Sequence, residues 1–333
     1  MAKGKMKDTE YLYLSAYIHA RENNIIGAER LERMLEARSP EEALKILEDA
    51  GWRVPDGCDA VMLEGLLSKR RDEAFTDMGS LAPNPAIVDI FRIRYDYHNA
   101  KCLIKAAAVG ADASAILSKA GRVPADKISR CFLEDSLSAL PKALGDAMAK
   151  ASDTLARTGD PQLADFILDE AYYAEFAEEA ERSSSAFLQG YAELSIDAAN
   201  LKSLVRAFRM NRDESFIKRV IMDGGSVKTI YVIAALGAPE TALELYGNTA
   251  LSAAVEPAKA ALAGKGITEL EKICDDTLNA YMSGAKLSPF GEKPLIGYLS
   301  AIEAEINAVR MVMTGQFAHI PADVTRRSLR EGV

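Results

Sequence analysis

The sequence has few of the residues that build reactive sites. Aromatic side chains make up 7% of its 333 residues, and it holds only four cysteines and three histidines. The cysteines lie far apart without a C-x-x-C pair, so we expect reduced thiols in a cytosolic protein. The histidines and cysteines form no cluster with the spacing of a metal site, and we expect no bound metal.

Long apolar runs and an excess of positive charge are also missing. No run of about 18 uncharged apolar residues occurs, so no membrane-spanning helix is expected, and the N-terminus has no long apolar core of a signal peptide. A net charge of −9 argues against a nucleic-acid groove, which needs a basic face. Ala, Leu and Glu are abundant and alternating β-branched runs are nearly absent, which predicts an all-α protein.

One helical stretch of the sequence occurs three times. In each copy an acidic residue is followed five positions later by a basic residue. The copies are residues 90–110, 191–211 and 299–317. The pairs are Asp96 with Lys101, Asp197 with Lys202, and Glu305 with Arg310. Apolar residues recur in the same phase in steps of three and four, which predicts helices that bury one stripe against a neighbour.

The spacing of the three acids predicts the domain organisation. They lie 101 and 108 residues apart, which indicates a unit of about a hundred residues used three times. We expect helical repeats over residues 1–112, 113–213 and 214–333, each ending in a long antiparallel helical hairpin. The expected hairpins are 58–75 with 86–110, 162–182 with 184–211, and 268–283 with 293–317, and residues 79–85 are expected to break the first.

The repeated polar residues have a structural and a functional interpretation. The acid and the base flank the apolar seam, where charges commonly pair across helices and set their register, so the structural interpretation is favoured. Asn99 and Asn200 occupy one site in two copies, in mid-helix, where asparagine is a poor choice. A hydrogen bond to a neighbouring segment would explain both. The third copy has Ala308 there, so this bond is not expected to be threefold.

Two further patterns superficially resemble catalytic motifs. Residues 223–229 contain paired glycines and end in Lys-Thr, but they do not match G-x-x-x-x-G-K-[ST], so we expect a turn followed by a helix. Several acid pairs lie within expected helices, where such residues are usually solvated or paired with Lys and Arg. They are Asp165 with Asp169, Glu178 with Glu179, and Glu303 with Glu305. We therefore expect no catalytic residue and no cofactor.

Several segments, in this order, resemble a known family. They are YLY at 11–13, AREN at 20–23, YDYHNAK at 95–101, IDAANLK at 196–202, PFGEKPL at 289–295 and LREGV at 329–333. The sequence is similar, over essentially its whole length, to the C subunit of archaeal and bacterial V-type (A-type) ATP synthases, a relative of the d subunit of eukaryotic V-ATPases. It departs from the family at Gly332, where an aromatic residue is common.

The resemblance implies a funnel of three similar all-helical domains with pseudo-threefold symmetry, located on the cytoplasmic side of a membrane rotor ring. The family's subunit receives the central-stalk subunits D and F and has no active site, while subunits A and B carry the nucleotide chemistry. Eight residues are candidate contacts with the stalk or ring, or interdomain packing residues: Asp96, Asn99, Lys101, Asp197, Asn200, Lys202, Glu305 and Arg310.

Two other classes remain alternatives at this point. One is a generic cytosolic helical scaffold, although the usual repeats of such proteins are about 33 to 47 residues long. The other is an all-helical enzyme that uses its Asp and Glu pairs, for which a deep pocket with two strongly perturbed carboxyl groups would be needed.

Overall fold

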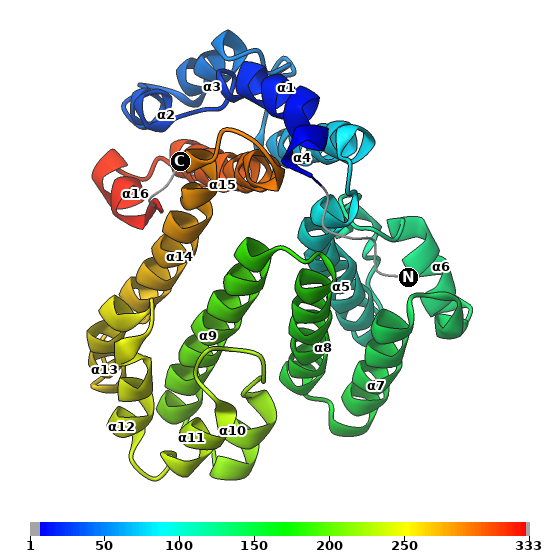
Figure 1. The fold of residues 1–333 in the computed structure, drawn as a ribbon, viewed down its shortest axis with the longest axis vertical. Helices are drawn as coiled ribbons and strands as arrows, with labels where there is room; N and C mark the ends of the chain where they lie inside the picture. Colours follow the sequence, from blue (N-terminus) through cyan, green and yellow to red (C-terminus); the bar gives the residue numbers. More distant parts are fainter. Residues whose placement is uncertain (1–6, 331–333) are drawn as a thin grey trace. The chain divides into compact units, whose positions relative to one another are not determined.

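The protein is built from α-helices joined by short turns. The computed structural model describes residues 7–330, and within that range it contains sixteen α-helices, six short 3-10 helices and no strand (Figure 1). This confirms the predicted all-α class. The last three residues of the LREGV segment, with Gly332 among them, lie outside the described residues.

The chain divides into two compact units. One combines Met1–Val88 with Asp275–Val333, and the other is the continuous segment Asp89–Cys274. The divisions fall near the start of α5 (Ala86–Ala108) and inside α14 (Thr268–Ser283). The expected division into three repeats stays a prediction.

The first unit is organised around helix α15 (Glu292–Phe317). It packs against helices from both ends of the chain, and its buried residues lie on all sides. A helix that is apolar all round is typical of the centre of a domain. The surrounding helices are α1 (Leu12–Glu22), α2 (Ala28–Leu35), α3 (Pro40–Asp49), α4 (Ala60–Leu81) and α16 (Ala322–Ser328).

Local sequence signals mark some helix boundaries in the first unit. Ser39 caps α3 by accepting the Glu42 N–H at 3.3 Å, and Pro40 occupies the first helical position, as expected. The break expected over residues 79–85 is confirmed in part, because α4 continues to Leu81 and the chain is non-helical from Ala82 to Pro85. Glycine inside a helix costs about 1 kcal/mol, and the burial of Met78 on the same helix face as Phe75 offsets that cost.

The second unit begins with a bundle of long helices. These are α5, α7 (Lys142–Thr158), α8 (Pro161–Arg182) and α9 (Ala186–Arg209), with the shorter α6 (Ala125–Leu133) beside them. Helix α8 packs on both α7 and α9 (Figure 1), so the second expected hairpin, α8 with α9, is confirmed. Apolar residues of α5 to α8, including Ile93, Ile128, Met148 and Leu168, form one continuous core cluster.

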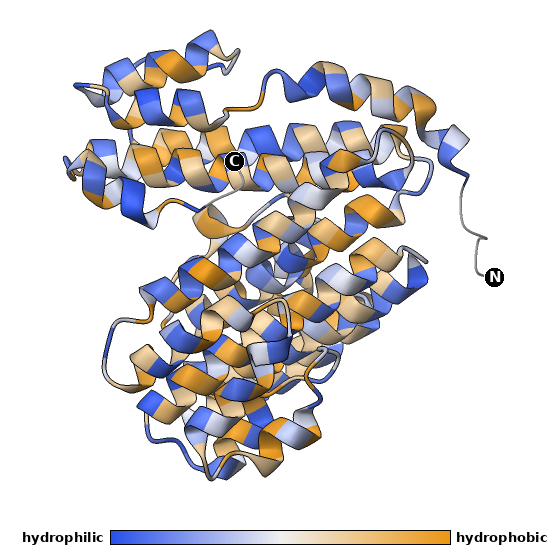
Figure 2. Cartoon of the chain, turned by 60° about the vertical axis from the view of Figure 1, so that its left-hand side comes forward, coloured by the Kyte–Doolittle hydropathy of each residue, from blue (hydrophilic) through white to orange (hydrophobic). Residues whose placement is uncertain are grey.

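Short helices complete the second unit after α9. They are α10 (Glu214–Val220), α11 (Thr229–Ala234), α12 (Pro239–Glu244) and α13 (Val255–Leu262), and α10, α12 and α13 pack on α9. Polar and apolar residues alternate around most helices (Figure 2). Within residues 7–330, no helix combines the length and the apolar character needed to cross a bilayer.

Candidate functional site

The three repeated acids lie inside the protein. Asp96 on α5, Asp197 on α9 and Glu305 on α15 are 0%, 1% and 0% exposed. The sequence placed these acids beside the apolar seam, and the structure shows in addition that all three are buried. A loop packs over each of these helices beside the acid, and the acid accepts one or two backbone hydrogen bonds from that loop. We call the three arrangements acid clamps.

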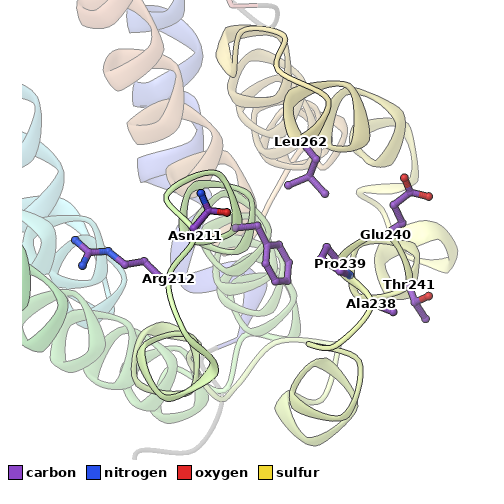
Figure 3. Close-up of a pocket in the computed structure, with 8 residues that line it drawn as sticks. Asn211, Arg212, Ala238, Pro239, Glu240, Thr241 and Leu262 are labelled. Carbon is purple, nitrogen blue, oxygen red and sulfur yellow. The ribbon is translucent and has the colours of Figure 1, made fainter.

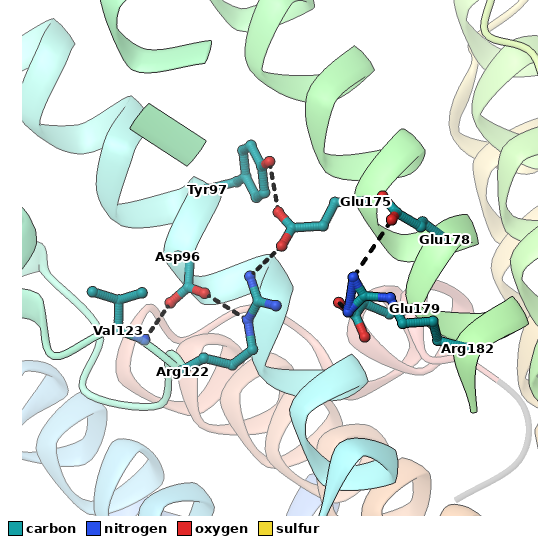
Figure 4. A network of polar contacts seen from close by, with 8 residues as sticks. All are labelled: Asp96, Tyr97, Arg122, Val123, Glu175, Glu178, Glu179 and Arg182. Carbon is teal, nitrogen blue, oxygen red and sulfur yellow. Dashed lines mark hydrogen bonds and ion pairs between the residues drawn. The ribbon is translucent and has the colours of Figure 1, made fainter. Parts of the chain in front are cut away.

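The first acid clamp holds residues 118–123 against α5. Asp96 Oδ1 accepts the Val123 N–H at 3.0 Å, and Oδ2 accepts the Arg122 Nε–H at 3.0 Å (Figure 4). The Arg122 guanidinium also donates to Glu175 on α8 at 2.7 Å, and the Tyr97 hydroxyl donates to the other oxygen of Glu175 at 2.8 Å. Arg122 thus links α5, the loop and α8.

The second acid clamp holds residues 222–227 against α9. Here the loop supplies N–H groups and a hydroxyl to the acid, where the first loop supplies an arginine. Asp197 accepts the N–H groups of Ser226 and Val227 at 3.1 and 3.2 Å, and it also accepts the Ser226 hydroxyl. A Cβ atom on Gly225 would overlap Asp197 Oδ1, just as one on Gly121 would overlap Asp96 Oδ1. Glycine is therefore required at this position in both loops.

The two asparagines fix the other end of the same loops. Asn99 donates to the Ser118 carbonyl at 2.8 Å and accepts the Ser118 N–H at 2.7 Å. Asn200 donates to the Met222 carbonyl at 2.8 Å and accepts the Met222 N–H at 2.9 Å. This confirms the predicted bond to a neighbouring segment. Because each amide satisfies a backbone donor and a backbone acceptor, each loop is anchored at both ends.

The third acid clamp joins the two ends of the chain in the first unit. Glu305 Oε1 accepts the Ile26 N–H at 2.7 Å, and Oε2 accepts the Arg70 Nε–H at 3.0 Å. Ile26 lies two residues before α2, just as Val123 and Val227 lie two residues before α6 and α11. Ala308 is buried at the asparagine site.

Burial changes the proton affinity of two of these acids. It raises the pKa of Asp96 to about 6, with the nearby Glu175 charge acting in the same direction and the Val123 N–H and Arg122 acting against it. Burial also raises the pKa of Glu305, although Arg70 and the Ile26 N–H favour its ionised form.

The repeated basic residues lie outside the acid clamps. Lys101 donates to Asp169 on α8 at 2.6 Å, and Arg310 makes a two-pronged ion pair with Glu64 on α4 at 2.6 and 3.0 Å. These pairs confirm that charges beside the seam link neighbouring helices. Lys202 is half-buried on α9. A role for Lys101, Lys202 and Arg310 in partner binding stays a prediction.

The acid pairs considered for catalysis are held by basic side chains. Asp165 pairs with Lys105, Glu178 and Glu179 pair with Arg182, and Glu303 pairs with Arg71. Asp169 and Glu305 are bound by Lys101 and Arg70, as described above. Residues 223–229 form a turn followed by α11, as expected, and the turn is part of the second acid clamp.

A cavity of about 800 Å³ lies in the second unit near the end of α9 (Figure 3). Phe208, Asn211, Pro239 and Leu262 are among the residues that line it. None of the repeated acids, asparagines or bases does so.

Sequence reasoning missed the partners of the acids. Arg122, Glu175 and Arg70 lie far from the acids along the chain and carry no pattern of their own. A shared signal for the loops was present, because Gly-Arg-Val at 121–123 and Gly-Ser-Val at 225–227 each precede a helix by one residue.

A family model described as the ATP synthase (C/AC39) subunit matches residues 14–328. The chain belongs to this family. It is 26% identical over 333 residues to the C subunit of the V-type sodium ATPase of Enterococcus hirae, covering 97% of this chain and 98% of that protein. It is 22% identical over 345 residues to the C subunit of the A-type ATP synthase of Methanocaldococcus jannaschii, covering 96% and 86% of the two chains. It is 24% identical over 340 residues to the C subunit of the A-type ATP synthase of Halorubrum lacusprofundi, covering 93% of this chain and 94% of that protein.

Membership of the C/AC39 family makes the chain a subunit of a rotary ATPase, and ion transport is the activity of that complex. The acid clamps are thus structural features of a protein that functions within a larger assembly.

Proposed function

We propose that this protein is a non-catalytic rotor subunit of a V/A-type ATP synthase. It connects the central shaft, made of subunits D and F, to the membrane rotor ring on the cytoplasmic face of the membrane, and so couples ATP turnover to proton or sodium transport. The observation that carries the proposal is the alignment with the C subunit of E. hirae over nearly the full length of both chains.

The acid clamps suit a part that transmits torque. A packed protein interior deforms little under load, and loops that are anchored at both ends add to this resistance. Residues 118–123 and 222–227 are each fixed by an asparagine at one end and an aspartate at the other. We infer that this keeps the helices in register while the rotor turns.

The absence of catalysis is part of the proposal, and the ion pairs of the acid residues support it. A general base needs a free carboxylate within reach of a substrate. Asp165, Asp169 and Glu303 are each bound to a lysine or an arginine. In our proposal the nucleotide chemistry takes place in subunits A and B.

The repeated residues divide into internal and surface groups under this proposal. The acids and asparagines have almost no exposed surface, so we assign them to packing inside the protein. Lys101, Lys202 and Arg310 are the members of the set that keep exposed surface for a stalk or ring contact. We also propose that the chain comprises three equivalent repeats, over residues 1–112, 113–213 and 214–333.

Co-expression with subunits D and F of the same organism, followed by size-exclusion chromatography at low and moderate salt, tests the proposal. A stoichiometric complex is the expected result. An elution position unchanged by D and F at both salt concentrations, together with no binding to purified rotor rings, would reject it in favour of a general scaffold.

Charge-reversal variants map the contact. Arg310→Glu is compared with Lys142→Glu, whose side chain is 88% exposed and pairs only within its own helix. If the surface around Arg310 contacts the stalk, Arg310→Glu weakens the complex and Lys142→Glu does not. Equal binding by both variants would place the contact elsewhere.

A further inference from the structure

The first acid clamp contains two carboxylates and one guanidinium. Within the described residues, the second has no such arrangement of two acids around one base. Asp96 and Glu175 are both buried and both bind the single guanidinium of Arg122. When both carboxyl groups are ionised, these three side chains carry one net negative charge. In the second acid clamp, Asp197 is bound by backbone N–H groups and by the Ser226 hydroxyl.

The charged and titratable groups around Asp96 come from three elements. Arg122 belongs to the loop, Glu175 to α8 and Tyr97 to α5, on which Asp96 itself lies. A further α5 carboxylate, Asp89, lies within the electrostatic field of Arg122 and pairs with its neighbour Arg92. Glu175 is the carboxylate whose charge raises the pKa of Asp96.

Such surroundings favour the binding of a proton. Charge is costly in a buried site, and a second carboxylate nearby raises that cost. The pKa of Asp96, about 6, agrees with this geometry and lies close to the range in which cellular compartments differ.

We propose that Asp96, Arg122 and Glu175 form a proton-operated latch between α5, residues 118–123 and α8. One proton from solvent adds to Oδ2 of Asp96, which becomes a hydroxyl and is then a weaker acceptor for the Arg122 Nε–H. Oδ1 still accepts the Val123 N–H, and Arg122 remains bound to Glu175. The net charge of the three side chains changes from −1 to 0, and no other bond is made or broken.

The latch would change how firmly the loop is held, and this inference does not depend on the proposed rotor function. In the ionised state Arg122 is bound at α5 and at α8. In the protonated state Arg122 stays bound at α8, Asn99 and the Val123 N–H still tie the loop to α5, and the net negative charge of the buried group is gone. Opening of the loop exposes Asp96 to water and returns its pKa towards that of a free aspartate, so the proton favours the closed loop and residues 119–122 become less mobile at mildly acidic pH.

The first test is a carbon-13 NMR titration of the aspartate side-chain carboxyl groups in the full-length protein. We expect one buried aspartate to titrate near pH 6, and we expect Glu175→Gln to lower its midpoint by about half a pH unit or more, because a like charge has been removed. A folded protein without a carboxyl midpoint above about pH 5, or with one that Glu175→Gln leaves unchanged, would overturn the proposal.

The second test measures the loop itself by amide hydrogen exchange in the wild-type protein. After correction for the intrinsic effect of pH, exchange of residues 118–123 should fall about threefold or more between pH 7.5 and 5.5, because the proton favours the closed loop. Residues 222–227 are the matched control and should not change. Equal behaviour of the two loops would reject the latch even if Asp96 titrates as expected.

Discussion

Asp96 and Asp197 solve one structural problem with different chemistry. Each lies buried in a long helix, and each fixes a six-residue loop that begins at an asparagine-bound residue and ends two residues before a helix. Asp96 does so with a guanidinium and one N–H, and Asp197 with two N–H groups and a hydroxyl. The geometry of the loop is thus the shared feature, and the charge balance is free to differ.

The difference teaches how a buried acid can be made stable or responsive. Direct backbone donors are fixed in place and cannot leave when the pH changes. An arginine on a loop can be shared with a second acid, and the shared arrangement then responds to protons. Substitutions in the two acid clamps should therefore differ both in size and in their dependence on pH.

Removal of the carboxylate from the second acid clamp should have the largest effect. We expect Asp197→Ala to lower the free energy of unfolding by about 3 kcal/mol or more, because it leaves the Ser226 and Val227 N–H groups without an acceptor. Urea unfolding at neutral pH measures this. The control is Asp153→Ala, an exposed acid on α7, for which the change should stay below about 0.5 kcal/mol. Similar losses in both variants would contradict a clamping role for Asp197.

The effect of Asp96→Asn should depend on pH. The folded protein holds a proton on Asp96 up to about pH 6, whereas an unfolded aspartate loses it near pH 4. Stability from this group is therefore present at low pH and is lost as the pH rises from 4 to 6. The asparagine of the variant cannot bind this proton, so the variant does not gain stability on acidification as the wild type does. The difference in free energy of unfolding between wild type and variant should therefore grow by about 2 kcal/mol from pH 7.5 to pH 4.5.

The measurement is urea unfolding of both proteins at several pH values. Subtracting one protein from the other cancels the other titrating groups. A deficit that shrinks on acidification would mean that the Arg122 ion pair outweighs burial, and that the pKa of Asp96 is lowered.

The asparagines allow a finer comparison of the two loops. Asn200→Ala should cost about 2 kcal/mol, because it leaves the donor and the acceptor of the buried Met222 unpaired. Asn99→Ala should cost less, about 1 kcal/mol, because Ser118 is half-buried and water can replace the amide. Thermal unfolding compares the two variants. In both, binding of the D and F subunits should be unchanged, and weakened binding in a stably folded variant would point to a contact role.

The ion pairs outside the acid clamps should matter least for stability. Lys101→Met should change the free energy of unfolding by less than about 1 kcal/mol, because the pair with Asp169 is partly exposed to solvent. Addition of salt should reduce even this difference. A loss as large as that of Asn200→Ala would show that the pair is a major determinant of the fold.

Helix positions were largely predictable from the sequence because they follow from local signals. Ser39 and Pro40 mark the start of α3, and the range 268–283 matches α14 residue for residue. The hydrogen bonds of Asn99 and Asn200 were also predictable, because an asparagine in mid-helix is unfavourable unless its amide binds a group outside the helix. The extension of α4 past Gly79 was not predictable, since it depends on the burial of Met78 by other elements.

The burial of the acids could not be derived from periodicity. A helical pattern indicates which face meets a neighbouring helix, but it does not show that a loop will cover the opposite face. Arg122 and Glu175 reach Asp96 only after three elements have come together. The partners of Glu305 are still harder to predict, because Ile26 and Arg70 lie 279 and 235 residues away along the chain.

The bond between Glu305 and Ile26 also sets an order of events during biosynthesis. The segment Asp89–Cys274 has all its residues once Cys274 has left the ribosome, so it can fold while translation continues. The unit that holds Ile26 must wait, since α15 and Glu305 are synthesised near the end of the chain. Until then α1 to α4 lack their central helix and expose the apolar faces that it covers. Helices α1 to α4 are therefore made before the second unit but are covered after it, and we expect chaperones to bind this segment while its apolar faces are exposed.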